Sequence, residues 1–362
     1  MPLTRRKKCA VPVGSKLANV KATATENQED GAQVKRSSSP PHGAPKKRTA
    51  FIDITNAHKV QISFPGRKKE AGKKVVKKTT SKSIPKEFDI DSENSEDIYI
   101  CPEYAKDIFD YLKQREEKFI LTNYMPRQPS LNPEMRAILV DWLVEVQENF
   151  ELYHETLYLA VKMTDHFLSK TPVHKEMLQL VGSTTMLIAC KFEEISPPFA
   201  EDFLYICDDA YTREELIAME ANILKTLSFD INIPIPYRFL RRYAKCASAG
   251  MDTLTLARFY CEISLMEMDL VSVRGSLLAS ACLLMALVTK DLGGWCPILQ
   301  FHSGYQTSDL APVVRRLHSL LLAPPDDKLR AVRNKYSHKV FFEVGSLPLV
   351  NVDILEKALS SQ

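Results

Sequence analysis

The sequence predicts an all-α protein of two tandem five-helix folds, preceded by a short N-terminal helix and a disordered basic tail. Three observations predict this class. Apolar residues recur with a helical period from Pro133 onward. The run Asn232–Pro236, which cannot continue a helix, divides these helices into two sets. Strand signals are nearly absent, since Val340–Val344 is too short to build a sheet.

The first 95 residues differ from the rest in composition and charge. Residues 1–85 hold 20 Lys/Arg and 5 Asp/Glu, a net charge of +15, whereas residues 86–362 hold 28 Lys/Arg and 40 Asp/Glu, a net charge of −12. Lys, Ser, Pro, Thr and Ala dominate residues 1–95, so we expect disorder there. An acidic hinge follows at Asp89–Asp97.

Basic clusters stand out in this tail. One is Lys46-Lys47-Arg48, and the other joins Arg67–Lys69 to the lysines at 73, 74, 77 and 78. Such clusters indicate nuclear import or nucleic-acid contact, and a solvated charge run is the alternative.

Residues 96–129 are predicted to form an N-terminal helix and a linker. The helix covers Tyr104–Phe119, and the stretch from Tyr124 to Pro133 is proline-rich and irregular. The apolar residues expected on one side of the helix are Ile108, Tyr111, Leu112 and Phe119.

The first five-helix fold is predicted over residues 130–231. Its helices are Pro133–Phe150, Glu155–Ser169, Lys175–Glu194, Ala200–Cys207 and Arg213–Leu227. Asn132 supplies an N-cap before Pro133 at the first helical position. The segment Met135–Val146 is apolar almost all round, so either other helices bury it completely or one stripe is left for a partner.

The second five-helix fold is predicted over residues 232–345, with a C-terminal tail at 346–362. Its helices are Pro236–Ala247, Leu254–Met268, Gly275–Thr289, Ser308–Leu322 and Asp326–Lys339. In each set the third helix is the most apolar and carries small residues, which let neighbouring helices approach closely. The two sets therefore indicate a duplicated helical domain.

Several classes of chemistry have no signature in the chain. It contains no dinucleotide or phosphate loop, no nucleophile elbow and no protein-kinase motif. The eight cysteines are scattered without metal-ligand spacing, so we expect neither a disulfide framework nor a metal or cofactor site. The N-terminus has no apolar signal core and no run approaches 18 apolar residues, so we expect neither secretion nor a membrane span.

Several separated motifs resemble the cyclin box. They are MRAILVDWLVEV at Met135–Val146, Leu159–Val161 with Asp165–Leu168, Leu180–Gly182, Lys191–Ile195 and Leu227–Asp230. The resemblance covers roughly residues 100–340 in order and is to mitotic cyclins of the A/B class. It implies two tandem cyclin-box folds and a regulatory subunit that is not itself an enzyme. Such a subunit binds and activates a cyclin-dependent kinase, recruits substrates and controls mitotic or meiotic progression.

The resemblance assigns roles to residues of the first fold. Lys191 and Glu220 match the charged kinase-contacting pair of the family, and Phe229 matches an aromatic residue at that interface. Ordinary solvation is the alternative for the two charges. Arg136 and Asp165 match an ion pair that joins the first two helices inside the fold.

The resemblance also implies a docking patch for short Arg-x-Leu peptides of substrates and inhibitors. Met135, Leu139 and Trp142 match its apolar floor, and Glu145 matches the residue that meets the basic side chain of the peptide. Leu178 and Gln179 match the facing wall. Core packing by Trp142 is the alternative.

The basic tail carries a further motif. Arg48, Phe51, Ile54 and Asn56 resemble a destruction box, in which phenylalanine replaces the usual leucine. This departure and the preceding Lys46-Lys47 resemble the third subtype of B cyclins, which implies a nuclear protein destroyed through an anaphase-promoting ubiquitin ligase. Ser39-Pro40 is a minimal proline-directed phosphorylation site.

A nucleic-acid-binding function is the competing hypothesis. Tandem cyclin-like folds also occur in general transcription factors, and the basic tail could hold phosphates. Nucleic acid is nevertheless an unlikely partner, because the helical body is acidic whereas a body that reads DNA carries a basic stripe.

Overall fold

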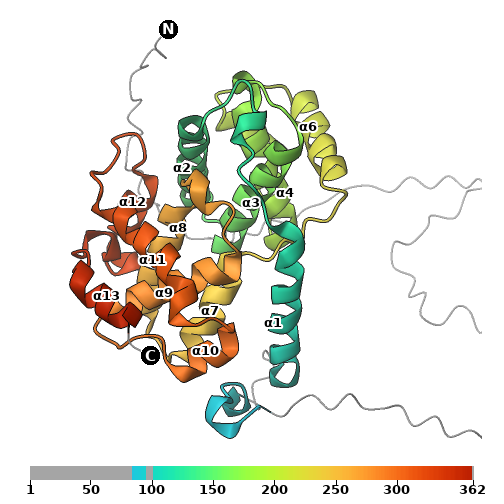
Figure 1. Ribbon diagram of the computed structural model, residues 1–362. Helices are drawn as coiled ribbons and strands as arrows, with labels where there is room; N and C mark the ends of the chain where they lie inside the picture. Colours follow the sequence, from blue (N-terminus) through green and yellow to red (C-terminus); the bar gives the residue numbers. More distant parts are fainter. Residues whose placement is uncertain (1–83, 95–100, 361–362) are drawn as a thin grey trace, which may run out of the picture. The chain divides into compact units, whose positions relative to one another are not determined.

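The computed structural model describes residues 84–94 and 101–360, and every regular element in these ranges is a helix. Thirteen α-helices and several 3₁₀ turns follow one another in this part of the chain. Figure 1 shows two helical repeats with α1 alongside them. The all-α prediction of tandem repeats behind an N-terminal helix is confirmed for the described residues.

The first repeat consists of five helices. They are α2 (Pro133–Asn149), α3 (His154–Lys170), α4 (Leu178–Glu193), α5 (Ala200–Tyr205) and α6 (Arg213–Thr226). The Asn132 side chain accepts a hydrogen bond from the Met135 amide at 2.8 Å, so the predicted cap starts α2. The central helix is α4, which α2, α3, α5 and α6 contact.

The second repeat has the same plan. Its helices are α7 (Pro236–Cys246), α8 (Met251–Ser264), α9 (Gly275–Thr289), α10 (Pro297–Ser303) and α11 (Thr307–Leu322). Helix α9 is buried along almost its whole length, and α7, α8 and α11 pack against it. The prediction omitted α10, which has seven residues between Gly294 and Gly304 and therefore shows little periodicity.

The predicted helix Asp326–Lys339 is wrong in extent. Only Ala331–Tyr336 forms a helix, α12. Its start is fixed by a residue of the first repeat, because the Asp141 carboxylate accepts hydrogen bonds from the Ala331 amide at 3.0 Å and the Arg330 amide at 3.3 Å. A cap supplied by a distant part of the chain leaves no local sequence signal.

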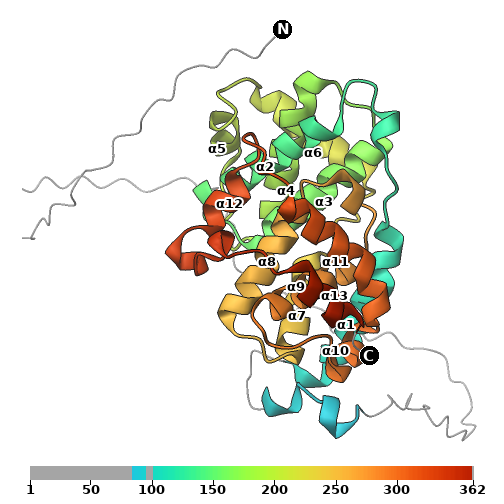
Figure 2. The same cartoon turned by 60° about the vertical axis from the view of Figure 1, so that its left-hand side comes forward.

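Two segments assigned to tails carry structure. Residues 84–94 form 3₁₀ turns, and Asp91 is buried in an ion pair with Arg242 of α7. The predicted disorder is therefore wrong for these residues. Residues 346–362 include α13 (Val352–Ser360), which packs against α9 and α11. Figure 2 shows α13 beside these two helices.

Helix α1 (Pro102–Glu116) has two apolar faces where the sequence predicted one. Phe109 and Leu112 pack against the core. Tyr104, Ile108 and Tyr111 are exposed by 59%, 47% and 53%. At 100° per residue these three side chains share one face, turned away from the packed face. The sequence placed Ile108, Tyr111 and Leu112 on the same side; of these three, only Leu112 packs against the core, whereas Ile108 and Tyr111 lie at the exposed edge of the apolar arc.

Candidate functional site

Lys191 and Glu220 lie together on the surface of the first repeat. Lys191 is in the last turn of α4, and its Nζ donates a hydrogen bond to Oε1 of Glu220 on α6 at 2.6 Å. The Lys191 side chain is 50% exposed and that of Glu220 is 18% exposed. The pair therefore places a solvent-accessible ammonium group beside the negative end of the α4 dipole.

Large apolar side chains on the same and neighbouring elements also face solvent. Phe192 is 44% exposed, Ile195 88%, Phe199 78% and Phe229 66%. The elements that carry them are neighbours, because α4, α5 and α6 contact one another and Phe229 follows α6. We call these four residues with Lys191 and Glu220 the α4–α6 patch. A cluster of exposed apolar residues around a charged pair indicates a protein-binding surface.

The backbone after α6 holds Phe229 outside the core. Ser228 and Phe229 both adopt positive φ, +55° and +57°, a conformation that L-residues other than glycine seldom take. The Phe229 amide donates to the Leu224 carbonyl at 2.8 Å, which closes the turn at the end of α6. This turn at the C-terminal end of α6 leaves the Phe229 side chain in solvent.

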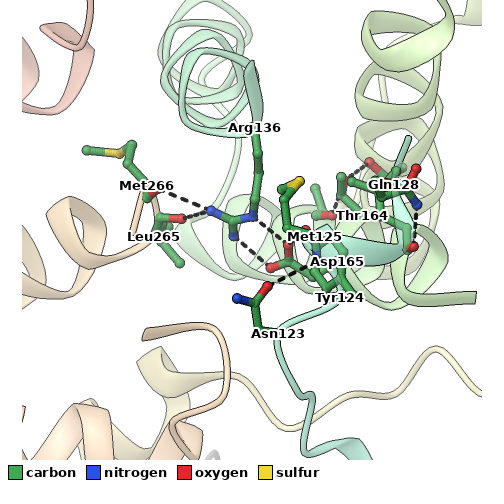
Figure 3. Close-up of polar contacts among 12 residues, drawn as sticks. Asn123, Tyr124, Met125, Gln128, Arg136, Thr164, Asp165, Leu265 and Met266 are labelled. Atoms are coloured by element: carbon green, nitrogen blue, oxygen red, sulfur yellow. Dashed lines mark hydrogen bonds and ion pairs between the residues drawn. The ribbon is translucent and has the colours of Figure 1, made fainter. Parts of the chain in front are cut away.

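Arg136 and Asp165 form a buried bidentate ion pair (Figure 3). Arg136 Nε and Nη2 donate to the two Asp165 oxygens at 2.6 and 2.8 Å, and the Tyr124 hydroxyl donates to Oδ1 at 2.6 Å. Burial raises the pKa of the Asp165 carboxyl, but the charge and hydrogen bonds of Arg136 outweigh it and hold this pKa below its usual range.

The same guanidinium reaches the second repeat. Arg136 Nη1 donates to the Leu265 carbonyl at 2.8 Å and to the Met266 carbonyl at 3.3 Å, as Figure 3 shows. Both carbonyls lie just after α8. Arg136 thus bonds α2, α3 and the second repeat at once, which the sequence did not reveal, and its role is structural.

The predicted docking residues lie along α2 and the start of α4. Met135 and Trp142 are half-buried and Leu139 is 5% exposed. Leu139 lies deep because it rests on Gly182 of α4, where an added Cβ would be 2.7 Å from Leu139 Cδ1. Ile138, 42% exposed, was missed although it lies one helical turn from Met135 and Trp142.

The three other predicted docking residues differ in exposure. Glu145 is exposed, Gln179 is half-buried and Leu178 is 7% exposed. The predicted docking residues therefore present partly accessible apolar atoms beside the exposed carboxylate of Glu145, near the end of α2. Whether a peptide binds there stays a prediction.

The remaining sequence-predicted residues lie outside the described ranges. They are the destruction-box residues Arg48, Phe51, Ile54 and Asn56, the basic residues Lys46 and Lys47, and Ser39.

In the part of the chain that the structure describes, no group of three or more His, Cys, Asp or Glu could hold a metal ion. Cys190, Cys207, Cys246, Cys261 and Cys282 are buried free thiols, whereas Cys101 is exposed. None of the described helices is long and apolar enough to cross a bilayer.

The described residues form two tandem helical repeats, and two family models match them. Residues 107–232 match the cyclin N-terminal domain and residues 234–349 match the cyclin C-terminal domain. The chain belongs to the cyclin family. The boundary between the models falls where the sequence placed the linker between the repeats.

Relatives named G2/mitotic-specific cyclin-B3 align over long stretches. The protein from Gallus gallus is 51% identical, and the alignment covers 100% of both chains. Those from Homo sapiens and Drosophila melanogaster are 54% and 47% identical over 78% and 76% of this chain. The alignments span about a fifth of the human relative (20%) and half of the fly relative (51%).

Solved structures include a viral cyclin from herpesvirus saimiri. It superposes with a TM-score of 0.54 at 24% sequence identity, covering 59% of this chain and 96% of the viral one. This similarity shows the fold.

Proposed function

We propose that the protein is the regulatory subunit of a cyclin-dependent kinase, which it binds and activates through the α4–α6 patch. The observation that carries the proposal is the exposure of Phe192, Ile195, Phe199 and Phe229 around the Lys191–Glu220 pair. A rigid helical body activates a partner by binding its active conformation more tightly than its inactive one.

Helix α1 supplies a second part of the same surface. Its exposed residues Tyr104, Ile108 and Tyr111 lie on the helix face that also carries Arg115. Arg115 forms an ion pair with Asp230, the residue after Phe229, and its Nε donates to the Asn232 carbonyl at 2.8 Å. The α1 stripe therefore approaches the Phe229 edge of the α4–α6 patch, and we include it in the proposed kinase interface.

The direct experiment mixes the purified chain with an inactive kinase catalytic subunit and measures binding and phosphorylation. Phe229→Ala should weaken binding by about tenfold or more, because exposed aromatic anchors carry much of the energy of such interfaces. Lys191→Glu should also weaken it. The matched control is Arg315→Ala, which breaks an exposed pair with Glu356 on the second repeat and should bind as wild type. A wild-type chain that neither binds nor activates the kinase overturns the proposal.

We further propose that the predicted docking residues on α2 (Met135, Leu139 and Trp142) recruit substrates. We also propose that the tail directs nuclear import and timed ubiquitin-mediated destruction by an anaphase-promoting ligase. Separate variants test the tail because Arg48 belongs to both motifs. Lys46→Ala with Lys47→Ala should shift the protein to the cytoplasm and leave its lifetime unchanged. Phe51→Ala with Asn56→Ala should prolong its lifetime at mitotic exit and leave it nuclear.

A further inference from the structure

Residues 84–94 make specific contacts with the second repeat. The Phe88 ring stacks on Phe301 of α10 with ring centroids 4.9 Å apart. The Phe88 carbonyl lies 2.7 Å from Nε2 of His302, on the same helix. An aromatic ring and a backbone carbonyl are thus held by groups more than 200 residues away in the sequence.

The carboxylate of Asp91 is buried beside two cationic side chains. Arg242 Nη1 and Nη2 donate to the two Asp91 oxygens at 2.5 and 2.7 Å, and Lys245 Nζ lies 3.5 Å away. The Arg242 and Asp91 side chains are 5% and 7% exposed. A buried bidentate pair is geometrically specific and is costly to leave half-made, so this contact fixes the position of the segment.

Arg242 also contacts α1. Its guanidinium carbon lies 5.1 Å from the centroid of the Phe109 ring, and Phe109 in turn packs near Phe239 with centroids 6.3 Å apart. One arginine of α7 therefore holds both the segment before α1 and the middle of α1 itself. The other fixed points of α1 lie toward its C-terminal end, where Glu116 accepts the Ser276 amide at 3.0 Å and Arg115 meets Asp230.

The two faces of α1 make this anchoring relevant to binding. Phe109 and Leu112 pack against the core, Phe109 beside α7 of the second repeat, and Tyr104, Ile108 and Tyr111 form the exposed stripe. A helix held at its middle and at its C-terminal end cannot rotate about its axis. The contacts of Arg242 therefore set the direction in which the stripe faces.

We propose that Arg242, Phe301 and His302 form a peptide-binding site for residues Phe88–Asp91 of the same chain, and that this site clamps α1 so that its exposed stripe is preorganised for the partner kinase. This inference rests on the proposed function. Preorganisation raises affinity because less conformational freedom is lost on binding. The apparent affinity also scales with the fraction of molecules that are already in the conformation that binds the kinase.

The experiment uses the full chain with Asp91→Asn, which keeps the side-chain shape and removes the charge. Phe88→Ala is a second variant that leaves the ion pair intact. The matched control is Asp110→Asn, which breaks the exposed Lys106–Asp110 pair on α1 itself. Amide hydrogen exchange of α1, α3 and α4 is measured in the free protein, and kinase affinity and association rate are measured by surface plasmon resonance.

Asp91→Asn and Phe88→Ala should accelerate exchange in α1 by about tenfold while α3 and α4 stay protected. Both should weaken kinase binding, mainly through slower association, and Asp110→Asn should match wild type in every measurement. Unchanged α1 exchange in both variants overturns the clamp. Faster α1 exchange with unchanged kinase affinity overturns its role in binding. Failure of the wild-type chain to bind any kinase defeats the proposed function instead, and the exchange data still decide whether the clamp exists.

Discussion

Replacing Arg136 by alanine tests whether the buried ion pair supports both repeats. The change would leave Asp165, 3% exposed, with the Tyr124 hydroxyl but without its cation. Removing one partner of a buried pair costs about 3–5 kcal/mol. The Leu265 and Met266 carbonyls lose their donor as well. Because these losses overlap, we expect the free energy of unfolding to fall by about 4 kcal/mol, a large part of ordinary domain stability.

The assay is urea unfolding of the full chain followed by circular dichroism at 222 nm, with thermal unfolding as a second measure. The control is again Arg315→Ala. Arg315 also forms a two-pronged pair, with Glu356 at 2.7 Å for each contact, but its side chain is 55% exposed. Exposed pairs contribute less than about 1 kcal/mol. If the two variants lose equal stability, or if Arg136→Ala loses less than about 1 kcal/mol, the reasoning from burial is refuted.

Three further perturbations have defined outcomes. Burial lowers the pKa of the His166 imidazole to about 4, below its unfolded value, so its contribution to stability is complete above pH 6.5 and is lost as the pH falls toward 4. Between pH 7 and 5 the wild-type chain should lose about 2 kcal/mol of unfolding free energy relative to His166→Gln in urea unfolding, and an equal pH dependence of the two proteins would contradict this. Trp142→Ala should weaken binding of an Arg-x-Leu peptide in calorimetry and leave kinase affinity intact; loss of both would identify Trp142 as a core residue. Gly182→Ala should cost about 1–3 kcal/mol of unfolding free energy, because its Cβ would displace the Leu139 side chain, and undiminished stability would show that Leu139 moves freely.

The sequence was sufficient where the signals are local. Asn132 and Pro133 mark the start of α2, and the small residues of α4 and α9 predict the central position of these helices. Short elements were missed for the opposite reason. Helix α12 depends on a neighbour distant in sequence, as the capping of Ala331 by Asp141 shows, whereas α10 has seven residues and therefore too little periodicity.

The candidate site divides in the same way. Lys191, Glu220 and Phe229 were nominated by resemblance, and the structure pairs Lys191 with Glu220 and exposes Phe229 just after α6. The sequence does not predict that Ile195 and Phe199 are exposed, because a single apolar residue near a turn is as compatible with burial as with exposure. Only the packing of α4, α5 and α6 shows that these side chains face solvent.

The sequence did not show which edge of the apolar arc of α1 is exposed, for a geometric reason. A helix that is apolar over a wide arc can turn either edge of that arc toward its neighbours. The choice is made by Arg242 and Ser276, which lie more than 120 residues downstream. Periodicity identifies the helix, and tertiary contacts decide its rotation.

The hydrogen bonds that cross between the repeats limit how this protein can be recombined. Arg136 needs the carbonyls of Leu265 and Met266, and the Ala331 amide needs the carboxylate of Asp141. A chimera that exchanged the first repeat for that of a relative would have to keep an arginine at position 136 and a carboxylate at position 141, whereas the partner groups in the second half of the chain are main-chain atoms. In these contacts the side chains that join the two repeats therefore all come from the first.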